Sequence, residues 1–494
     1  MAQNIDVLLI NPGDRRQIYQ GLGDEFSAIE PPVFAGLFAT YLRKKNRSVA
    51  ILDGPALNWS SDELARVAAE DFNAELIVIV VYGFQPSAST QNMTVAGDIT
   101  NKIKQHNKDL KVMMTGTHPA ALPFNTMSNE VVDFVVDLEG PVTIYKTLEA
   151  LKAGERNFSK IPSLWWRDGS NIVRPKSREP LIGNLDSEMP GIAWDLLPME
   201  SYRSHNWHSF DNIADRSPYA SIHTSLGCPY KCSFCCINSP FGKSSYRMWS
   251  PETVIKEIDH LVEYYGVKNI KFVDEMFVLN KRHVMGLCEL LKKRDYEVNI
   301  WAYARVDTVQ DVFLDNLKEA GINWLCLGIE SASDHVRDGA QKTYGNSDII
   351  EVVRKIQNAG IYIIGNYIFG LPDDTIARMQ ATFDLAKELT CEFANFYSAM
   401  AYPGSDLYDL AIDSGFDLPN EWKDYSQHGY NTKPLSNKYC SSAEILGFRD
   451  NAFNGYFTDK AYLRMVKKKF GPDVVEHISR MVSVPLSRKL LEDS

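Results

Sequence analysis

The chain has 494 residues, 45% of them hydrophobic and 23% charged, and it carries a formal net charge of −11. This length exceeds what one ordinary core holds, so we expect two or three globular domains, and the acidic balance disfavours general nucleic-acid binding, which needs a basic face. The longest apolar run, 76–81, is too short to cross a bilayer, and the first residues lack a signal-peptide pattern, so we expect a cytoplasmic protein without a membrane span.

Apolar runs and helical patterns alternate through residues 1–153. The expected helices lie near 33–45, 61–71 and 90–106, and the expected strands lie at 6–11, 48–53, 76–81, 111–115 and 134–136. This alternation predicts a doubly wound, Rossmann-like parallel sheet, in which a ligand binds beyond the carboxyl ends of the strands. No G-x-G-x-x-G follows the first strand, which counts against a dinucleotide site.

The turns after these strands are the candidate ligand contacts, since glycine there lets the backbone approach a ligand. The turn residues are Asn11, Pro12, Asp53, Tyr82, Gly83, Gly116, Thr117, His118, Glu139 and Gly140, with Glu30 and Pro31 in the loop ahead of the first helix. A doubly wound domain that binds a nucleotide, or no ligand, is the alternative for this half of the chain.

Residues 154–218 form a connector that is rich in Pro, Ser, Trp and Asn. Its tryptophans indicate an ordered segment, and its turn residues predict a short hairpin across the junction between two domains. We therefore place the first domain at 1–153 and the second at 219–424, followed by a mainly helical region at 425–494.

Three cysteines, Cys228, Cys232 and Cys235, follow the connector with the spacing C-x3-C-x2-C. Three thiolates this close can ligate three irons of one [4Fe–4S] cluster and leave the fourth iron open. Zinc sites favour paired ligands, and the five other cysteines are scattered singly, so they form neither a second pair nor a disulfide framework. Cysteines that merely pack as small buried side chains are the plain alternative.

The run Ser225-Leu-Gly-Cys228-Pro-Tyr-Lys-Cys232-Ser-Phe-Cys235 resembles the motif of the radical S-adenosylmethionine (radical SAM) superfamily. The resemblance implies that the open iron chelates the amino and carboxylate groups of SAM. It also implies that an electron from the cluster cleaves SAM to methionine and a 5′-deoxyadenosyl radical.

Strand–helix alternation resumes after the connector. Strands are expected at 220–224, 269–273, 299–304, 324–328, 362–368 and 392–398, and Ser250 with Pro251 opens the first helix. Six such units fit the partial (β/α)6 TIM barrel that radical SAM enzymes share, with functional residues at the carboxyl ends of the strands. The SAM contacts that the resemblance implies are Phe234 near the adenine, Asp274 and Glu275 near the amino group, Arg305, Glu330 and Ser331 around SAM, and Asn366 and Phe369 on the strand beside the adenine.

The turns of the first domain resemble the cobalamin-binding domain that precedes many radical SAM domains. The matching pieces are 8–12, 30–32 with 36–37, 49–53, 116–119 and 137–140. The resemblance implies a cobalamin pocket lined by the turn residues named above, His118 among them. The D-x-H-x-x-G signature of histidine-ligated cobalamin is absent, since neither Asp98 nor Asp109 begins it, so we expect base-off cobalamin without a histidine on cobalt.

Together these features predict a cobalamin-dependent radical SAM enzyme, a methyltransferase that acts on an unactivated carbon or on phosphorus. The implied mechanism uses one SAM to methylate cob(I)alamin and a second SAM to make the radical, after which the substrate radical takes a methyl group from methylcobalamin. The expected partners are a small-molecule substrate and a one-electron donor such as flavodoxin or ferredoxin. Two alternatives stay open: a cyclase or oxidoreductase without methyl transfer, and a non-catalytic iron–sulfur sensor or scaffold.

Overall fold

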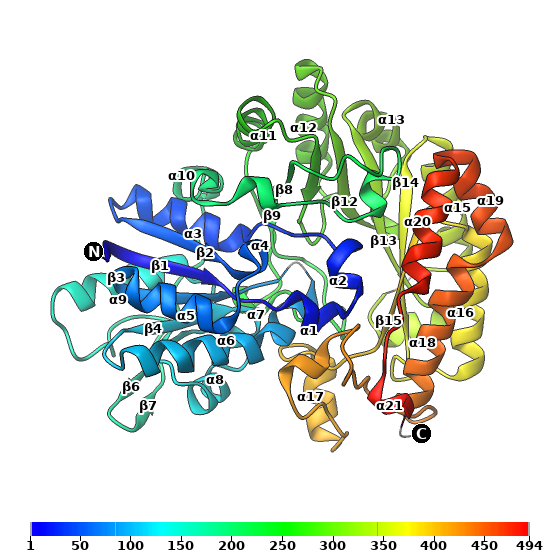
Figure 1. Ribbon diagram of the computed structural model, residues 1–494. Coiled ribbons are helices and arrows are strands. Elements are labelled where there is room, and N and C mark those ends of the chain that lie inside the picture. The colour runs from blue at the N-terminus through cyan, green and yellow to red at the C-terminus, as the bar shows by residue number, and fades with distance from the viewer. Residues whose placement is uncertain (1, 84, 343, 493–494) are drawn as a thin grey trace.

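The computed structural model describes residues 2–83, 85–342 and 344–492. Two sheets organise the molecule, a seven-stranded sheet near the N-terminus and a six-stranded sheet in the second half (Figure 1). A two-stranded ribbon and a helical C-terminal region complete the fold. The predicted α/β class, with a Rossmann-like domain ahead of a partial barrel, is confirmed.

The first sheet has the strand order β2-β1-β3-β4-β5-β6-β7. Its parallel strands are β1 (Gln3–Asn11), β2 (Val49–Asp53), β3 (Phe72–Val81), β4 (Val112–Gly116) and β5 (Phe134–Val136). Leu76 to Ile79 in the middle of β3 are completely buried. Helices cover both faces of such a sheet, which is why its strands appear in the sequence as continuous apolar runs.

Two layers of helices enclose this sheet. Val7 and Leu9 of β1 share a core with the helices α3 (Val33–Lys44) and α9 (Pro141–Lys152). The alternate β1 side chains, Leu8 and Ile10, share a second core with α5 (Ser61–Glu70) and α6 (Pro86–His106). Short helices occupy the connections: α1 (Arg15–Tyr19), α2 (Leu22–Glu25), α4 (Gly54–Leu57), α7 (Thr117–Ala121) and α8 (Pro123–Asn129).

The connector contains the predicted hairpin, but in another place. Strands β6 (Leu164–Asp168) and β7 (Asn171–Val173) pair antiparallel, and β6 pairs antiparallel with β5. The hairpin therefore extends the first sheet, and the expectation that it crosses the domain junction is wrong. The physical reason is its tryptophan: Trp166 is buried against Phe158, and Phe158 packs on Phe134 of β5. The connector continues through α10 (Leu185–Glu188) and three short 3-10 turns.

The second sheet is a parallel half-barrel with the order β15-β14-β13-β12-β11-β8. Its strands are β8 (Tyr219–Ile222), β11 (Asn269–Phe272), β12 (Asn299–Arg305), β13 (Ile322–Glu330), β14 (Tyr362–Phe369) and β15 (Phe393–Ser398). The helices between them are α11 (Pro251–Tyr265), α12 (Lys281–Arg294), α13 (Asp311–Glu319), α14 (Asp334–Gly339), α15 (Asn346–Asn358) and α16 (Ile376–Leu389). Ser250 caps α11 as predicted, since its side chain accepts a hydrogen bond from the Thr253 amide at 3.2 Å.

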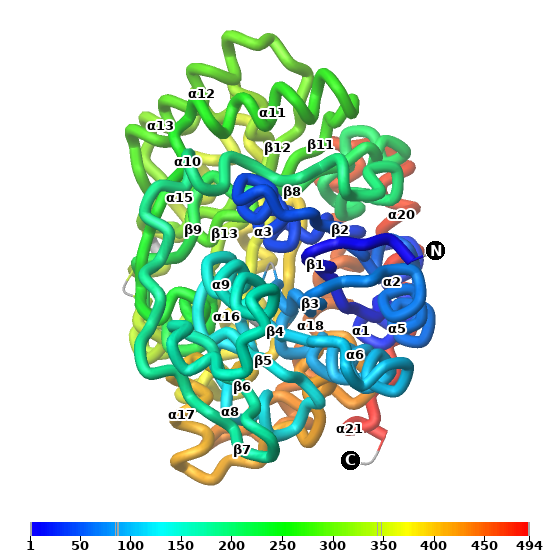
Figure 2. The backbone as a smooth tube through the Cα atoms, turned by 90° about the vertical axis from the view of Figure 1, so that its left-hand side faces the viewer, coloured from blue at the N-terminus to red at the C-terminus, as the bar shows by residue number. Residues whose placement is uncertain are grey.

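The C-terminal region is helical, as predicted. After α17 (Asp406–Asp413) come α18 (Ser442–Phe457), α19 (Lys460–Phe470), α20 (Pro472–Ser483) and α21 (Lys489–Glu492). Helix α18 lies against β15, and just before this strand the Cys391 carbonyl accepts a hydrogen bond from the Tyr456 hydroxyl at 2.6 Å. Figure 2 shows α17 at the opposite end of the molecule from α11 and α12. None of the described helices is both long and apolar enough to cross a membrane.

A buried acid joins the two halves. Glu30, in the loop between α2 and α3, lies 3.0 Å from Lys271 Nζ of β11 and accepts hydrogen bonds from Tyr219 at 2.9 Å and from Ser221, both on β8. His205 of the connector lies 3.6 Å away. Burial alone would raise the pKa of Glu30, but the charge of Lys271 and the hydrogen bonds from Ser221 and Lys271 lower that pKa. We call this group the Glu30 clasp.

The clasp predicts a strong stability effect at Lys271. Lys271→Met removes the ammonium group and leaves the Glu30 carboxylate buried without its cation, which costs about 3–5 kcal/mol in comparable pairs. We expect a loss of that size in the free energy of unfolding, measured by urea denaturation.

The matched control is Lys292→Met. Lys292 pairs with Glu319 at 3.1 Å, but these side chains are 32% and 63% exposed, and exposed pairs contribute about 0–1 kcal/mol. Equal losses in the two variants would contradict a clasp role for Glu30.

Candidate active site

Three neighbouring cavities lie between the carboxyl ends of the first sheet and the inside of the half-barrel. The cysteine cavity, about 240 Å³, is lined by all three motif cysteines. The edge cavity, about 120 Å³, is lined by Asn11, Pro12 and Gly83 at the ends of β1 and β3. The central chamber, about 210 Å³, is lined by residues of both halves and of the C-terminal region.

Shared walls make these cavities neighbours. Tyr303, Asn366, Tyr397 and Gln427 line both the cysteine cavity and the central chamber. Tyr19, Ala28, Glu30, Ala88 and Gln91 line both the central chamber and the edge cavity. A ligand in the central chamber would therefore contact walls of both other cavities.

The cysteine loop is held in shape by its own backbone. It follows β9 (Ser225–Leu226), which pairs with β10 (Arg247–Met248). Gly227 has φ +84°, and a Cβ there would lie 2.6 Å from the Ser245 carbonyl oxygen, so glycine is required. The Asn238 amide accepts from the Cys228 N–H at 3.1 Å and donates to the Cys228 carbonyl at 3.0 Å, which closes the loop.

The three thiols suit a cluster better than a single ion. Burial raises the pKa of Cys228 to about 11 and holds the pKa of Cys235 well above its usual range, and metal binding displaces thiol protons of this kind. Among the described residues, no three His, Cys, Asp or Glu side chains converge as ligands of one metal ion would. A cube spreads its thiolates over separate irons. Cys236 lies outside the cavity lining and packs with Met400.

Arg305 reaches the cysteine loop from the end of β12. Its Nη1 lies 3.6 Å from Cys232 Sγ, and its guanidinium group lies 3.9 Å from the Tyr230 ring centre. Asp307 fixes it through a bond of 2.9 Å to Nε. Hydrogen bonds to the sulfur ligands of an iron–sulfur cluster tune its properties. The position of Arg305 therefore fits a role of Cys232 as a cluster ligand.

Four other predicted SAM contacts also line the cysteine cavity: Phe234, Glu275, Glu330 and Asn366. Glu275 accepts from the Gly227 N–H at 3.1 Å, and burial with the neighbouring Asp274 raises the pKa of Glu275 to about 8. Glu330 has φ +64° and forms a buried ion pair with Lys342. Lys342 lies on the cavity wall too, and sequence reasoning missed it because it follows α14, away from any strand end or motif.

Three predicted SAM contacts lie outside this lining. Asp274 accepts from the Thr224 N–H, the Thr224 hydroxyl and the Ser225 hydroxyl, each at 2.6 Å, and so fastens the segment before the cysteine loop. Ser331 is buried beside Thr382, at 3.2 Å. Phe369 packs in the core against other aromatic rings.

Five of the predicted cobalamin contacts line the edge cavity: Asn11, Pro12, Glu30, Tyr82 and Gly83. Asp53 stands behind them, where it accepts from Asn11 Nδ2 at 2.9 Å and from the Tyr202 hydroxyl at 2.8 Å. Burial raises the pKa of Asp53 to about 6. The backbone at Gly83 lies close to helix α6, since a Cβ at this position would lie 2.4 Å from Ala88 Cβ.

The other predicted cobalamin contacts lie outside the edge-cavity lining: Pro31, Gly116, Thr117, His118, Glu139 and Gly140. Glu139 pairs with Arg247 of β10 at 2.7 Å and joins the first sheet to the cysteine loop. His118 is 1% exposed, and its ring centre lies 4.5 Å from that of Trp422. Its Nδ1 lies 3.2 Å from Thr90 Oγ1, and its Nε2 has no partner among the described residues.

The central chamber is also lined by side chains of the C-terminal region. Arg449 and Phe453 come from α18, and Gln427 and His428 from the loop before it. This region was predicted to be mainly helical, but no motif marked Gln427, His428 or Arg449 as site residues.

Comparison with known proteins agrees with this geometry. The family model "Radical SAM superfamily" matches residues 222–386, and the "B12 binding domain" model matches residues 19–146. An uncharacterized methyltransferase, PH0819 of Pyrococcus horikoshii, is 31% identical over 421 residues, 85% of this chain and 86% of that protein. The anaerobic magnesium-protoporphyrin IX monomethyl ester cyclase of Rubrivivax gelatinosus is 23% identical, over 93% of this chain and 78% of its own.

A solved structure shows the same fold. It is the radical S-adenosylmethionine methyltransferase TsrM of Kitasatospora setae with cobalamin and a [4Fe–4S] cluster bound. The TM-score is 0.68 at 17% identity, and the match covers 93% of this chain and 90% of TsrM.

His118 gives a prediction for acid stability. Burial lowers its pKa to about 3 in the fold, against about 6.5 in an unfolded chain. The unfolded state therefore binds more protons, so stability is lost as the pH falls from about 6.5 towards 3, by about 1.4 kcal/mol per pH unit for one such group. We expect His118→Gln to reduce the slope of unfolding free energy against pH by that amount.

The slope is measured by urea denaturation between pH 6 and pH 4, without added corrinoid. His335→Gln is the matched control, because that side chain is 65% exposed. If the two variants give the same profile, His118 is not held neutral by burial.

Proposed function

The chain belongs to the family of radical SAM proteins that carry a B12 binding domain, and we propose that it is a methyltransferase that uses a [4Fe–4S] cluster, SAM and cobalamin. One observation carries the proposal: the cysteine cavity and the edge cavity both border the central chamber. A substrate there would face a source of radicals on one side and a methyl carrier on the other. The names of PH0819 and TsrM support methyl transfer.

When bound, the cluster supplies the electron that cleaves SAM, and cobalamin supplies the methyl carrier. Cys228, Cys232 and Cys235 would hold the cluster. The carboxyl groups of Glu275 and Glu330 line the same cavity as Lys342. They offer acceptors for the SAM ammonium group, whose charge would favour the ionised form of Glu275, and Lys342 offers a cation for the SAM carboxylate.

For cobalamin, the edge cavity offers turn residues such as Asn11 and Gly83 together with the aromatic rings of Phe34 and Tyr82. No histidine is among its described lining residues, and His118 is turned into the core against Trp422. This supports the base-off cofactor without a histidine on cobalt. The proposal includes a small-molecule substrate and a one-electron donor of the flavodoxin or ferredoxin class.

A cyclase or oxidoreductase without methyl transfer is the second candidate, because the Rubrivivax cyclase matches 93% of this chain. Methyl-labelled SAM separates the two. The anaerobically reconstituted protein is incubated with labelled SAM, reductant and cobalamin, and the corrinoid is then isolated. Label in the corrinoid supports the methyltransferase, whereas 5′-deoxyadenosine without corrinoid label supports the cyclase type.

The cluster assignment predicts different results at two thiols of the same segment, Cys228 and Cys236. Cys228→Ala removes a ligand, so the variant should lose SAM cleavage to below about 1% of the wild-type rate and should hold less iron and sulfide per chain. The readouts are 5′-deoxyadenosine by chromatography and colorimetric iron and sulfide.

Cys236→Ala is the matched control, since Cys236 is buried outside the cysteine cavity. We expect it to keep the iron, the sulfide and the cleavage rate. Wild-type cleavage in Cys228→Ala would overturn the assignment, and a wild-type protein that holds iron and sulfide but forms no 5′-deoxyadenosine would favour a sensor or scaffold.

A further inference from the structure

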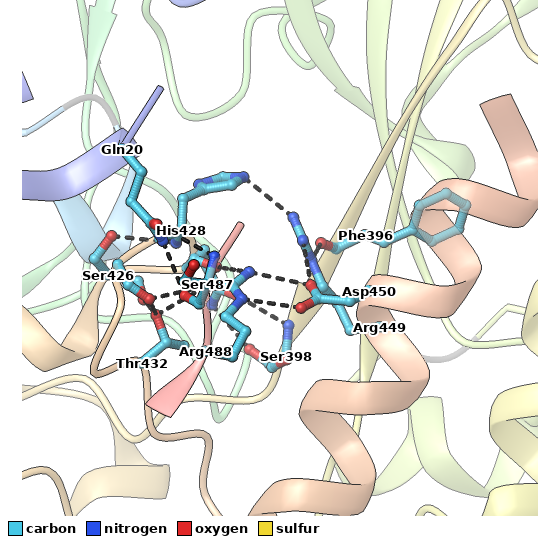
Figure 3. Close-up of polar contacts among 12 residues, drawn as sticks. Gln20, Phe396, Ser398, Ser426, His428, Thr432, Arg449, Asp450, Ser487 and Arg488 are labelled. Atoms are coloured by element: carbon cyan, nitrogen blue, oxygen red, sulfur yellow. Dashed lines mark hydrogen bonds and ion pairs between the residues drawn. The ribbon is translucent and has the colours of Figure 1, made fainter. Parts of the chain in front are cut away.

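A buried arginine faces the central chamber. Arg449, on α18, is 3% exposed and lines the chamber. Its Nε donates to the Phe396 carbonyl at 2.7 Å, its Nη1 to Asp450 at 2.7 Å, and its Nη2 lies 3.1 Å from His428 Nε2. Figure 3 shows this guanidinium group between the His428 ring and the Asp450 carboxylate. Each terminal nitrogen carries a second N–H that these contacts leave unused.

The charges around Arg449 do not balance. Asp450 also binds Arg488, which is 3% exposed, with Nε 2.9 Å from Asp450 Oδ2. His428 adds no negative charge, and burial together with the two guanidinium groups holds its pKa well below its usual range. Two buried cations therefore share one carboxylate, which leaves an excess of one positive charge.

The rest of the chamber wall does not supply the missing anion. Glu30 is the acidic side chain among the described lining residues, and it is taken up by Lys271 in the Glu30 clasp. A buried cation without a counterion is costly. In an enzyme, such a cation on the wall of a substrate chamber fits an anionic ligand.

We propose that Arg449 binds a carboxylate group of the substrate, so that the substrate is a small organic acid with an aromatic or apolar body. A carboxylate carries the single negative charge that the network lacks, and the planar guanidinium group suits it. The body would lie against the aromatic wall formed by Trp301, Tyr303 and Phe396. Tyr303 also borders the cysteine cavity. A substrate bound in this orientation therefore directs its apolar body towards the cysteine cavity.

The alternative is a structural role, in which the network only fastens the C-terminal tail. Arg488 serves that role by donating to the carbonyls of Gly429 and Gln427, at 2.9 and 3.1 Å. Arg488 is not among the chamber-lining residues, whereas Arg449 is. Arg488 thus fastens the C-terminal tail, whereas Arg449 faces the chamber.

The inference rests on the proposed function only in treating the central chamber as the substrate site. The test uses the protein loaded with cluster and cobalamin, and anaerobic calorimetry with three probes. Phenylacetate is a small aromatic monoanion, phenylacetamide is its neutral isostere, and phenylphosphonate is a dianion. We expect phenylacetate to bind at least ten-fold more tightly than phenylacetamide. Arg449→Gln should lower the affinity for phenylacetate at least ten-fold and leave that for phenylacetamide unchanged.

Asp450→Asn is the decisive partner variant, because it removes the shared carboxylate and raises the excess positive charge. Substrate-anion binding predicts tighter phenylacetate binding in Asp450→Asn, by about three-fold or more. A purely structural network predicts that both variants weaken it. If Arg449→Gln does not fold, Arg449→Lys replaces it, and the loss of the two-nitrogen fork should still lower the affinity at least three-fold.

Several results would overturn the inference: equal affinity for acid and amide, weaker binding in both variants, or no binding of any probe. Tighter binding of phenylphosphonate than of phenylacetate would show that the site binds a phosphonate and not a carboxylate. The same samples are assayed for 5′-deoxyadenosine. A wild-type protein that binds phenylacetate through Arg449 but does not cleave SAM would refute the proposed function alone.

Discussion

The arrangement of this protein depends on the buried carboxylate of Glu30. An ionised acid is stable inside a protein only when a cation and hydrogen-bond donors surround it, and here Lys271, Tyr219 and Ser221 supply them from the first two strands of the half-barrel. The loop that carries Glu30 belongs to the N-terminal half. The clasp therefore fixes the end of one sheet against the inside of the other, and a second pair, Glu139 with Arg247, ties the same halves beside the cysteine loop.

Burial at this junction keeps several titratable groups neutral, and most of the charges that remain lie in ion pairs. Desolvation lowers the pKa of His205 to about 4 and that of His223 to about 3, so both rings are neutral and act as polar contacts. The thiol of Cys228 is likewise held protonated until a metal binds. Radical chemistry requires such a dry enclosure. Arg449 keeps its charge, as guanidinium groups do in proteins, and it shares its carboxylate partner with Arg488, so it has the strongest claim to an anionic ligand.

The strands were predictable because burial on both faces produces apolar runs that a sequence displays directly, as Leu76 to Ile79 do in β3. The cysteine spacing likewise predicted a cluster loop, and all three cysteines line one cavity. Side-chain direction was not predictable: Asp274 follows a strand as expected, but its carboxylate is taken up by Thr224 and Ser225. Nor does any local pattern reveal that Trp166 would pull the connector hairpin onto the edge of the first sheet.

The half-barrel explains why recognition residues escaped the sequence. Its order runs from β15 to β8, so the sheet does not close on itself, and the C-terminal region must complete the wall. Gln427 does this at β15, where its amide accepts from the Ser398 N–H at 3.0 Å and donates to the Ser398 carbonyl at 2.9 Å, as a neighbouring strand would. Helix α18 then brings Arg449 to the chamber. The cysteine loop is held by strand ends and close turns such as Gly227, whereas Arg449 comes from a helix outside the half-barrel. The C-terminal region therefore supplies the charged contact to the substrate, while the half-barrel supplies the aromatic wall and the cysteine loop.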